Sequence, residues 1–158
     1  MTTRRNLLIA GGTLLTGLAA AGAYVGLAGT AEAGPIFHGE TEGVAINGYD
    51  AVAYFTQNAP VAGSSDHVFD WRGARWHFAS AENRAAFAAD PERYAPRYGG
   101  FCAFAMAQGQ KVKTDPAAFS IVDGKLYLNY DLPVRDRWDA DRANFIAAAD
   151  ERWPKVSR

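Results

Sequence analysis

The residues best suited to chemistry are one cysteine, one methionine and one histidine. Cys102 is the single cysteine of the chain, and Met106 follows it by one helical turn, which places both sulfur atoms on one face if this apolar run is helical. Thiolate and thioether groups are soft donors, and with an imidazole they suit copper(I) better than calcium or magnesium. His77 is the favoured imidazole, because it lies in a predicted strand, whereas His38 and His67 lie in predicted loops. The pattern therefore predicts a metal site at Cys102, His77 and Met106.

A second interpretation gives these residues structural roles. A lone cysteine beside Phe101, Ala103 and Phe104 is typical of a small buried hydrophobic residue, and methionine commonly fills gaps in a core. The protein would then bind a small ligand or another protein through aromatic residues that converge on a pocket, and Cys102 would be purely structural. The aromatic residues in or beside predicted loops and turns are Tyr49, Tyr54, Phe55, Trp71, Trp76, Tyr94 and Tyr98.

Catalytic motifs are weak in this chain. The stretch 64–67 reads Ser-Ser-Asp-His and has the residue types of a hydrolase triad, but contiguous loop residues rarely reach the required geometry. The sequence has no G-x-S-x-G, no phosphate-binding loop and no H-E-x-x-H. A cysteine nucleophile would need a histidine close to Cys102, for which His77 is the candidate. We therefore expect a protein that is not an enzyme.

Charge and composition limit the class of partner. The chain has 16 Lys and Arg against 17 Asp and Glu, so it lacks the basic footprint of a nucleic-acid-binding protein. Aromatic residues make up 13% of the chain and include four tryptophans, enough for a core without disulfides. The expected partners are a metal ion or a small ligand.

The N-terminal segment 1–33 predicts export. Arg4 and Arg5 precede an uncharged apolar run, and the Ala-Glu-Ala at 31–33 is typical of a signal-peptidase site. The paired arginines favour the twin-arginine route. The run is long enough to span a bilayer, but its glycines and the adjacent cleavage site favour removal over retention as an anchor. We expect a twin-arginine signal segment at 1–33 and one periplasmic domain at 34–158, with membrane contact only if the segment is retained.

Two β-hairpins are predicted in the exported domain. The first joins the aromatic runs 68–71 and 75–78. The second joins 119–122 and 125–130 through Asp-Gly, the dipeptide typical of a type I′ turn. Hairpins of this kind predict antiparallel sheets.

Helices are expected at 51–55, 81–89, 101–109 and 134–153. Asp50 and Ser80 would cap the first two, and Pro154 would end the last. A short strand is expected at 44–47, and no internal repeat is visible. The predicted architecture is a single α+β domain of antiparallel hairpins packed against two or three helices on one side.

Several of these segments resemble the exported bacterial branch of the YHS-domain family. The sequence I-N-G-Y-D-A-V-A-Y-F at 46–55 resembles the family's G-Y-D-P-V-A-Y-F opening. Its central F-A-S-x-E-N-R-x-x-F and D-P-x-x-Y-A-P blocks have counterparts at 76–87 and 90–96, and its Y-G-G-Y-C-A at 98–103. The resemblance covers nearly all of 34–158 and implies a YHS-type domain.

The wider YHS group includes metal-handling domains attached to heavy-metal ATPases. In those domains the end of a strand reads F-C-S-x-x-C, whereas this chain has Ala79 and Asn83 at the two cysteine positions. Metal binding is therefore not implied at those positions. The leading expectation is a soft-metal site, such as one for copper, at Cys102 with a histidine. The alternative is a periplasmic small-ligand or protein-interaction module.

Overall fold

The computed structural model describes residues 34–158. The expected twin-arginine signal, its cleavage site and its alternative role as an anchor all fall at 1–33, outside the described residues. Among the residues described, no helix is both long and apolar enough to cross a membrane.

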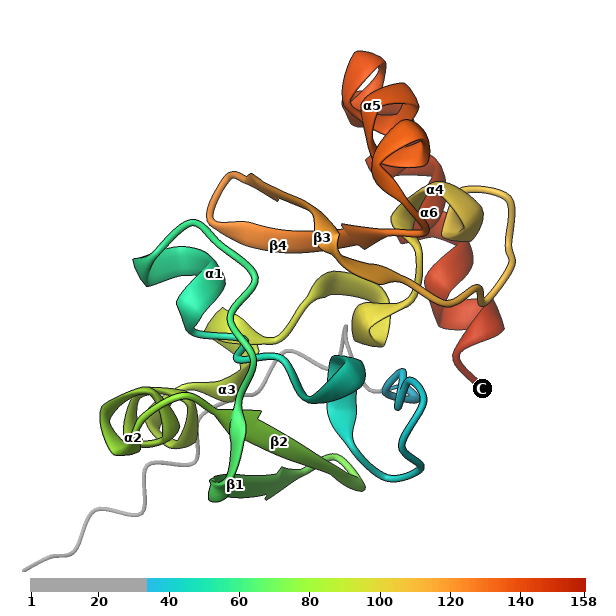
Figure 1. Ribbon diagram of the computed structural model, residues 1–158. Coiled ribbons are helices and arrows are strands. Elements are labelled where there is room, and N and C mark those ends of the chain that lie inside the picture. Colours follow the sequence, from blue (N-terminus) through green and yellow to red (C-terminus); the bar gives the residue numbers. More distant parts are fainter. Residues whose placement is uncertain (1–33) are drawn as a thin grey trace, which may run out of the picture.

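The predicted α+β class is confirmed, with two small antiparallel sheets and their helices (Figure 1). The first half of the domain contains η2 (Ala45–Gly48), α1 (Ala53–Thr56), β1 (Ser64–Trp71), β2 (Ala74–Phe78), α2 (Ala81–Ala89) and α3 (Pro91–Tyr94). The second half contains η3 (Arg97–Gly100), α4 (Ala103–Met106), β3 (Asp115–Val122), β4 (Lys125–Asn129), α5 (Leu132–Ala140) and α6 (Arg142–Val156). The helices are divided between the hairpins, α2 beside the first and α4 and α5 beside the second, and are not gathered on one side as expected.

The two halves repeat the same order of elements. β1 and β3 are equal in length, as are β2 and β4, and α2 and α5. The offset along the chain is also the same for the three pairs, whose first residues are Ser64 and Asp115, Ala74 and Lys125, and Ala81 and Leu132. The repeat is visible in the structure although none was predicted from the sequence.

Both predicted hairpins are confirmed, and they turn in the same way. Arg72 and Gly73 have φ values of 51° and 72°, and Asp123 and Gly124 have 50° and 70°. Two successive positive φ values are what a type I′ turn requires, and this turn matches the twist of the strands that it joins.

The helices that follow the hairpins begin at equivalent side-chain caps. Ser80 Oγ accepts a hydrogen bond of 3.1 Å from the backbone N–H of Asn83, and α2 spans the predicted residues. Asp131 holds the equivalent position in the second half, and its Oδ1 accepts a hydrogen bond of 2.8 Å from the N–H of Val134. Caps of this kind satisfy N–H groups that have no partner within the helix.

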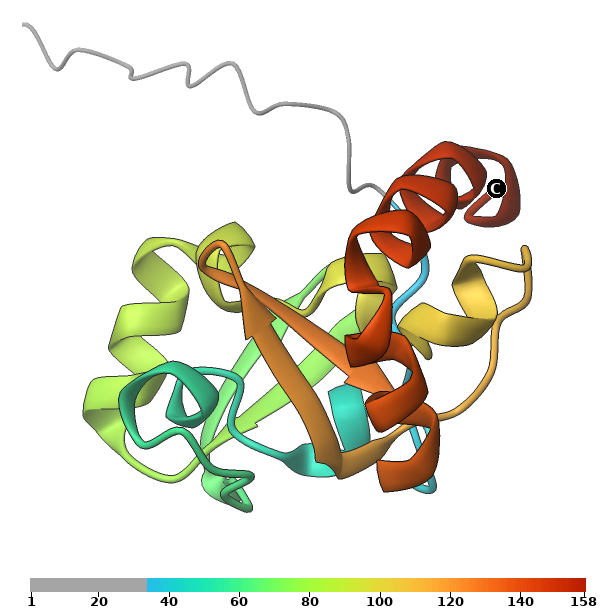
Figure 2. The ribbon, with the colours of Figure 1, turned by 90° about the horizontal axis from the view of Figure 1, so that it is seen from above.

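The hairpins cross face to face, and the main core lies between them (Figure 2). Trp76 and Phe78 of β2 and Leu126 and Leu128 of β4 are at most 1% exposed. A second cluster packs beneath α5 and α6 and includes Tyr98, Met106, Tyr127, Trp138 and Trp153. Burying a side chain of this size stabilises the fold by about 1.5–3 kcal/mol.

Three local predictions need correction. Residues 44–47 do not form a strand, because Ile46 and Asn47 turn the chain with φ values of 42° and 57°. The helix predicted at 134–153 is two helices, α5 and α6, because Asp141 leaves helical geometry at φ −144° and ψ 39°. Pro154 does not end α6, which continues to Val156.

Candidate functional site

Cys102 lies at the start of α4, which is one turn long and shorter than the predicted helix at 101–109. Its side chain is 1% exposed and packs with Ala105 and Val134. The sulfur accepts a hydrogen bond of 3.5 Å from the backbone N–H of Ala105, and the thiol donates one of 3.7 Å to Asn129 Oδ1. Cys102 therefore caps α4 from a buried position.

Asp50 has the matching place in the first half, before α1. Its carboxylate is fully buried and accepts hydrogen bonds from the backbone N–H groups of Val52 at 2.8 Å, Ala53 at 3.2 Å and Ala79 at 2.8 Å. The side-chain amide of Asn83 donates a fourth, at 2.7 Å. One buried acid thus ties together α1, the end of β2 and the first turn of α2.

The backbone N–H groups of Ala105, Tyr130 and Phe104 lie near the Cys102 sulfur; Ala105 donates to the sulfur at 3.5 Å, and Phe104 donates to Asn129 Oδ1 at 3.1 Å. These three donors occupy the positions in the second half that match the three backbone donors around the Asp50 carboxylate in the first. Burial raises the pKa of the Cys102 thiol, and the opposing effect of the N–H groups does not overcome it. The equivalence and the neutral thiol favour a structural role for Cys102.

The other two predicted ligands lie in different surroundings. Met106 is fully buried in the second core cluster with Tyr127 and Trp138, so its side chain does not share the environment of Cys102. Cys102 is the N-cap of α4 with a non-helical ψ of 116°, so it is not itself part of the helix that was predicted to carry both residues. His77 is on β2 of the other hairpin, opposite Val68.

Metal binding receives no further support from the side-chain geometry. Within 34–158 there is no group of three or more His, Cys, Asp or Glu residues placed to hold a metal ion. Copper binding through Cys102 stays a prediction of the sequence.

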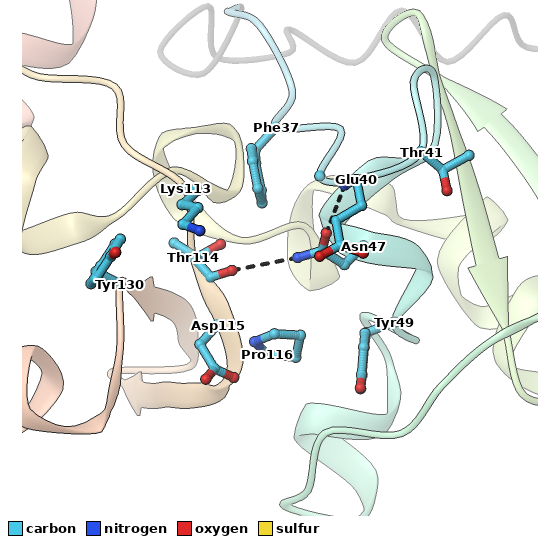
Figure 3. Close-up of a pocket in the computed structure, with 11 residues that line it drawn as sticks. Phe37, Glu40, Thr41, Asn47, Tyr49, Lys113, Thr114, Asp115, Pro116 and Tyr130 are labelled. Carbon is cyan, nitrogen blue, oxygen red and sulfur yellow. Dashed lines mark hydrogen bonds between the residues drawn. The ribbon is translucent and has the colours of Figure 1, made fainter.

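A cleft of about 640 Å³ lies between the two halves, and we call it the inter-half cleft (Figure 3). One wall comes from the first half and the segment before it, and the other from residues 113–116, which lead into β3, and from Tyr130, which follows β4. The lining residues are Phe37, Gly39, Glu40, Thr41, Asn47 and Tyr49 on the first wall, and Lys113, Thr114, Asp115, Pro116 and Tyr130 on the second.

Asn47 connects the two walls of the inter-half cleft. Its Oδ1 accepts a hydrogen bond of 3.0 Å from the backbone N–H of Glu40, and its Nδ2 donates one of 3.4 Å to the carbonyl oxygen of Thr114 (Figure 3). The backbone here is strained, since Ile46 and Asn47 are both left-handed and Ile46 is β-branched. A hydrogen bond of 2.8 Å from the Ile46 N–H to the carbonyl of Phe37 holds the turn in place.

The matching turn in the second half, in η3, shows what Asn47 adds. Tyr98 and Gly99 have φ values of 57° and 62°, so the backbone is left-handed there as well. Glycine takes this conformation without strain, whereas Asn47 occupies it with a side chain. The first half therefore keeps a residue whose side chain bridges the cleft.

The seven predicted aromatic residues differ in their surroundings, and Phe55, Trp71 and Tyr94 are partly buried against the main core. Tyr54, Trp76 and Tyr98 are fully buried and belong to the core. Tyr49 lines the inter-half cleft, together with Tyr130, whose side chain is 42% exposed. Of the seven aromatic residues that were expected to form a pocket, Tyr49 lines the inter-half cleft.

Sequence reasoning missed most of the cleft. Asn47, Lys113 and Tyr130 were not singled out, because they come from segments far apart in the chain. The available signal was the Asn-Gly dipeptide that follows Ile46, since this dipeptide favours a left-handed turn over the strand that was predicted.

Comparison of the chain with protein-family models, with curated proteins and with solved structures gives no match in any of the three.

Proposed function

We propose that this protein is a binding domain that holds a small organic ligand in the inter-half cleft and carries out no reaction on it. The observation that carries the proposal is the Asn47 side chain, which links both walls of the cleft from a strained backbone. Strain of this kind costs about 1–3 kcal/mol and is concentrated at functional sites. A glycine at position 47 would take the left-handed conformation more readily than asparagine but would remove the bridge.

The size and position of the cleft support the same proposal. Its volume of about 640 Å³ lies within the range of small-molecule sites, which is about 300–1,000 Å³. Such sites commonly form where two structural units meet, and this cleft lies between the repeated halves. Phe37, Tyr49 and Tyr130 supply aromatic surface, and the remaining lining supplies polar groups.

We also propose, from the sequence resemblance and the paired arginines, that the domain is of YHS type and acts outside the cytoplasmic membrane. Cys102 then has a structural role in the second half, equivalent to that of Asp50 in the first. Binding would depend on the cleft and not on the thiol.

The experiment is a binding screen with the purified protein. Amino acids, simple amines, carboxylates and monosaccharides are tested separately by thermal shift and by saturation-transfer NMR. We expect at least one class to bind. If no compound in any class binds, the proposed function is wrong.

Matched variants locate the binding site. Tyr130→Ala removes a side chain from the cleft, whereas Leu132→Ala removes a side chain of similar exposure, 45%, from a nearby residue outside the cleft. Binding should weaken in the first variant and persist in the second. Asn47→Gly keeps the left-handed backbone and removes the bridge, so it should weaken binding while the protein stays folded. Binding that is unchanged in Tyr130→Ala and Asn47→Gly would place the ligand elsewhere.

A further inference from the structure

Opposite charges stand on opposite walls of the inter-half cleft. Figure 3 shows Lys113 on one side and Glu40 on the other, with the hydrogen bond from Asn47 to Thr114 between them. Within the described residues, the Lys113 ammonium forms no ion pair, and neither does the Glu40 carboxylate. Asp115 adds a second carboxylate on the Lys113 wall.

The Lys113 ammonium lies over an aromatic ring. Its Nζ is 5.7 Å from the centroid of the Tyr130 ring, a distance at which the ring face attracts a cation. This contact places the ammonium at one end of the cleft, where the oxygen atoms of a ligand can reach it. Asp115 Oδ1 accepts a hydrogen bond of 2.8 Å from the N–H of Ala117, which fixes the orientation of that carboxylate.

These charges discriminate between ligand classes. A ligand with only a negative charge would pair with Lys113 but would be repelled by Glu40 and Asp115. A ligand with only a positive charge would pair with a carboxylate but would leave Lys113 without a countercharge. A neutral ligand would pair with none of the three groups, whereas a ligand that carries both charges can pair with Lys113 on one wall and with Glu40 on the other.

We propose that the inter-half cleft binds a zwitterionic α-amino acid with an apolar side chain, an inference that rests on the proposed function. The ligand carboxylate pairs with Lys113, and the ligand ammonium faces Glu40. The apolar side chain lies against the aromatic surface of Phe37 and Tyr49, which line the same cleft.

The test uses four compounds that share a phenyl ring and differ in charge. L-Phenylalanine carries both charges, phenethylamine only the positive charge, 3-phenylpropanoate only the negative charge, and 2-phenylethanol neither. Dissociation constants for the purified protein are measured at pH 7 by NMR titration. We expect phenylalanine to bind at least tenfold more tightly than each of the other three, because a charge-assisted hydrogen bond contributes about a factor of ten or more.

Charge-removing variants assign each contact. Lys113→Gln should weaken the binding of phenylalanine about tenfold, while phenethylamine binds no more weakly than to the unmodified protein. Glu40→Gln should also weaken the binding of phenylalanine, while 3-phenylpropanoate binds no more weakly than before. Lys111→Gln is the control, since Lys111 is exposed on the same segment and does not line the cleft. It should change neither affinity.

The possible failures are distinguishable. Equal affinity for all four compounds, or tighter binding of the amine or the acid alone, overturns the zwitterion proposal and leaves the proposed function standing. The zwitterion proposal is likewise overturned, and the proposed function stands, if a monosaccharide binds at the cleft but neither phenylalanine nor any other apolar amino acid of the screen binds there. Absence of binding by every compound in the screen overturns both.

Discussion

Replacing Asp50 by asparagine tests the internal organisation of the first half. The change keeps the shape of the side chain but turns one of the two acceptor oxygens into an NH2 group. Oδ1 accepts from the N–H groups of Val52 and Ala53, and Oδ2 accepts from the Ala79 N–H and from Asn83 Nδ2. An NH2 group at the second position would face two donors.

The size of the effect follows from which donors can adapt. Asn83 can rotate its side-chain amide and offer its oxygen to the new NH2 group, but the Ala79 N–H is part of the backbone and cannot. A hydrogen bond to a charged group contributes about 1.5–3 kcal/mol, and the contacts that remain become weaker when the charge is lost. We therefore expect Asp50→Asn to lower the free energy of unfolding by about 3 kcal/mol, a large part of the roughly 5–15 kcal/mol of a typical domain.

The assay is urea unfolding followed by tryptophan fluorescence, since Trp76 and Trp138 are fully buried. Asp70→Asn is the matched control: its side chain is 75% exposed and pairs with the exposed Arg75, so a change within about 0.5 kcal/mol is expected. A loss below about 1 kcal/mol for Asp50→Asn would refute the reasoning. If that variant does not fold, Asn83→Ala removes a single donor and should still cost about 1 kcal/mol.

Three further predictions concern the second half. Gly99→Ala should destabilise the protein by more than about 2 kcal/mol, because a Cβ there would overlap the backbone oxygen of Pro35. Gly124→Ala places its Cβ in open space and should cost about 1 kcal/mol, and urea unfolding measures both variants. Burial raises the pKa of Tyr98 above its usual value near 10, so the unfolded chain ionises first and stability should fall as the pH rises above about 10. Tyr98→Phe should reduce that alkaline loss, and equal slopes from pH 9 to 11 in both proteins would contradict this. Cys102 should react with a thiol reagent at neutral pH far more slowly in the native protein than in the unfolded chain, and rapid labelling of the native protein would contradict the buried, neutral thiol. Cys102→Ser should stay folded, because serine is also a good helix cap.

Local sequence signals predicted the elements whose geometry depends on neighbouring residues. Asp123-Gly124 supplied the left-handed turn of the second hairpin, and Ser80 supplied the cap of α2. Both features arise within a few residues, so they are visible without knowledge of the fold. The α+β class followed from these signals.

Long-range contacts decided where local signals failed. Val44 and Ile46 are residue types that favour a strand, yet Ile46 is held in a left-handed turn by the carbonyl of Phe37. For Ile46, a contact outside the local window set the backbone conformation. Cys102 is the cap of a one-turn helix and not part of it, so the longer helix expected at 101–109 does not form.

The sequence by itself determined the hairpins, the helix caps and the α+β class, because each depends on turn chemistry or on the spacing of nearby residues. Only the tertiary structure revealed that the halves repeat and that Cys102 stands where the first half has Asp50. The matching positions hold different residue types, an acid in one half and a thiol in the other, so the sequence does not display the equivalence. The inter-half cleft likewise exists only after folding, because its walls come from segments that are far apart in the chain, as the hydrogen bond between Asn47 and Thr114 shows.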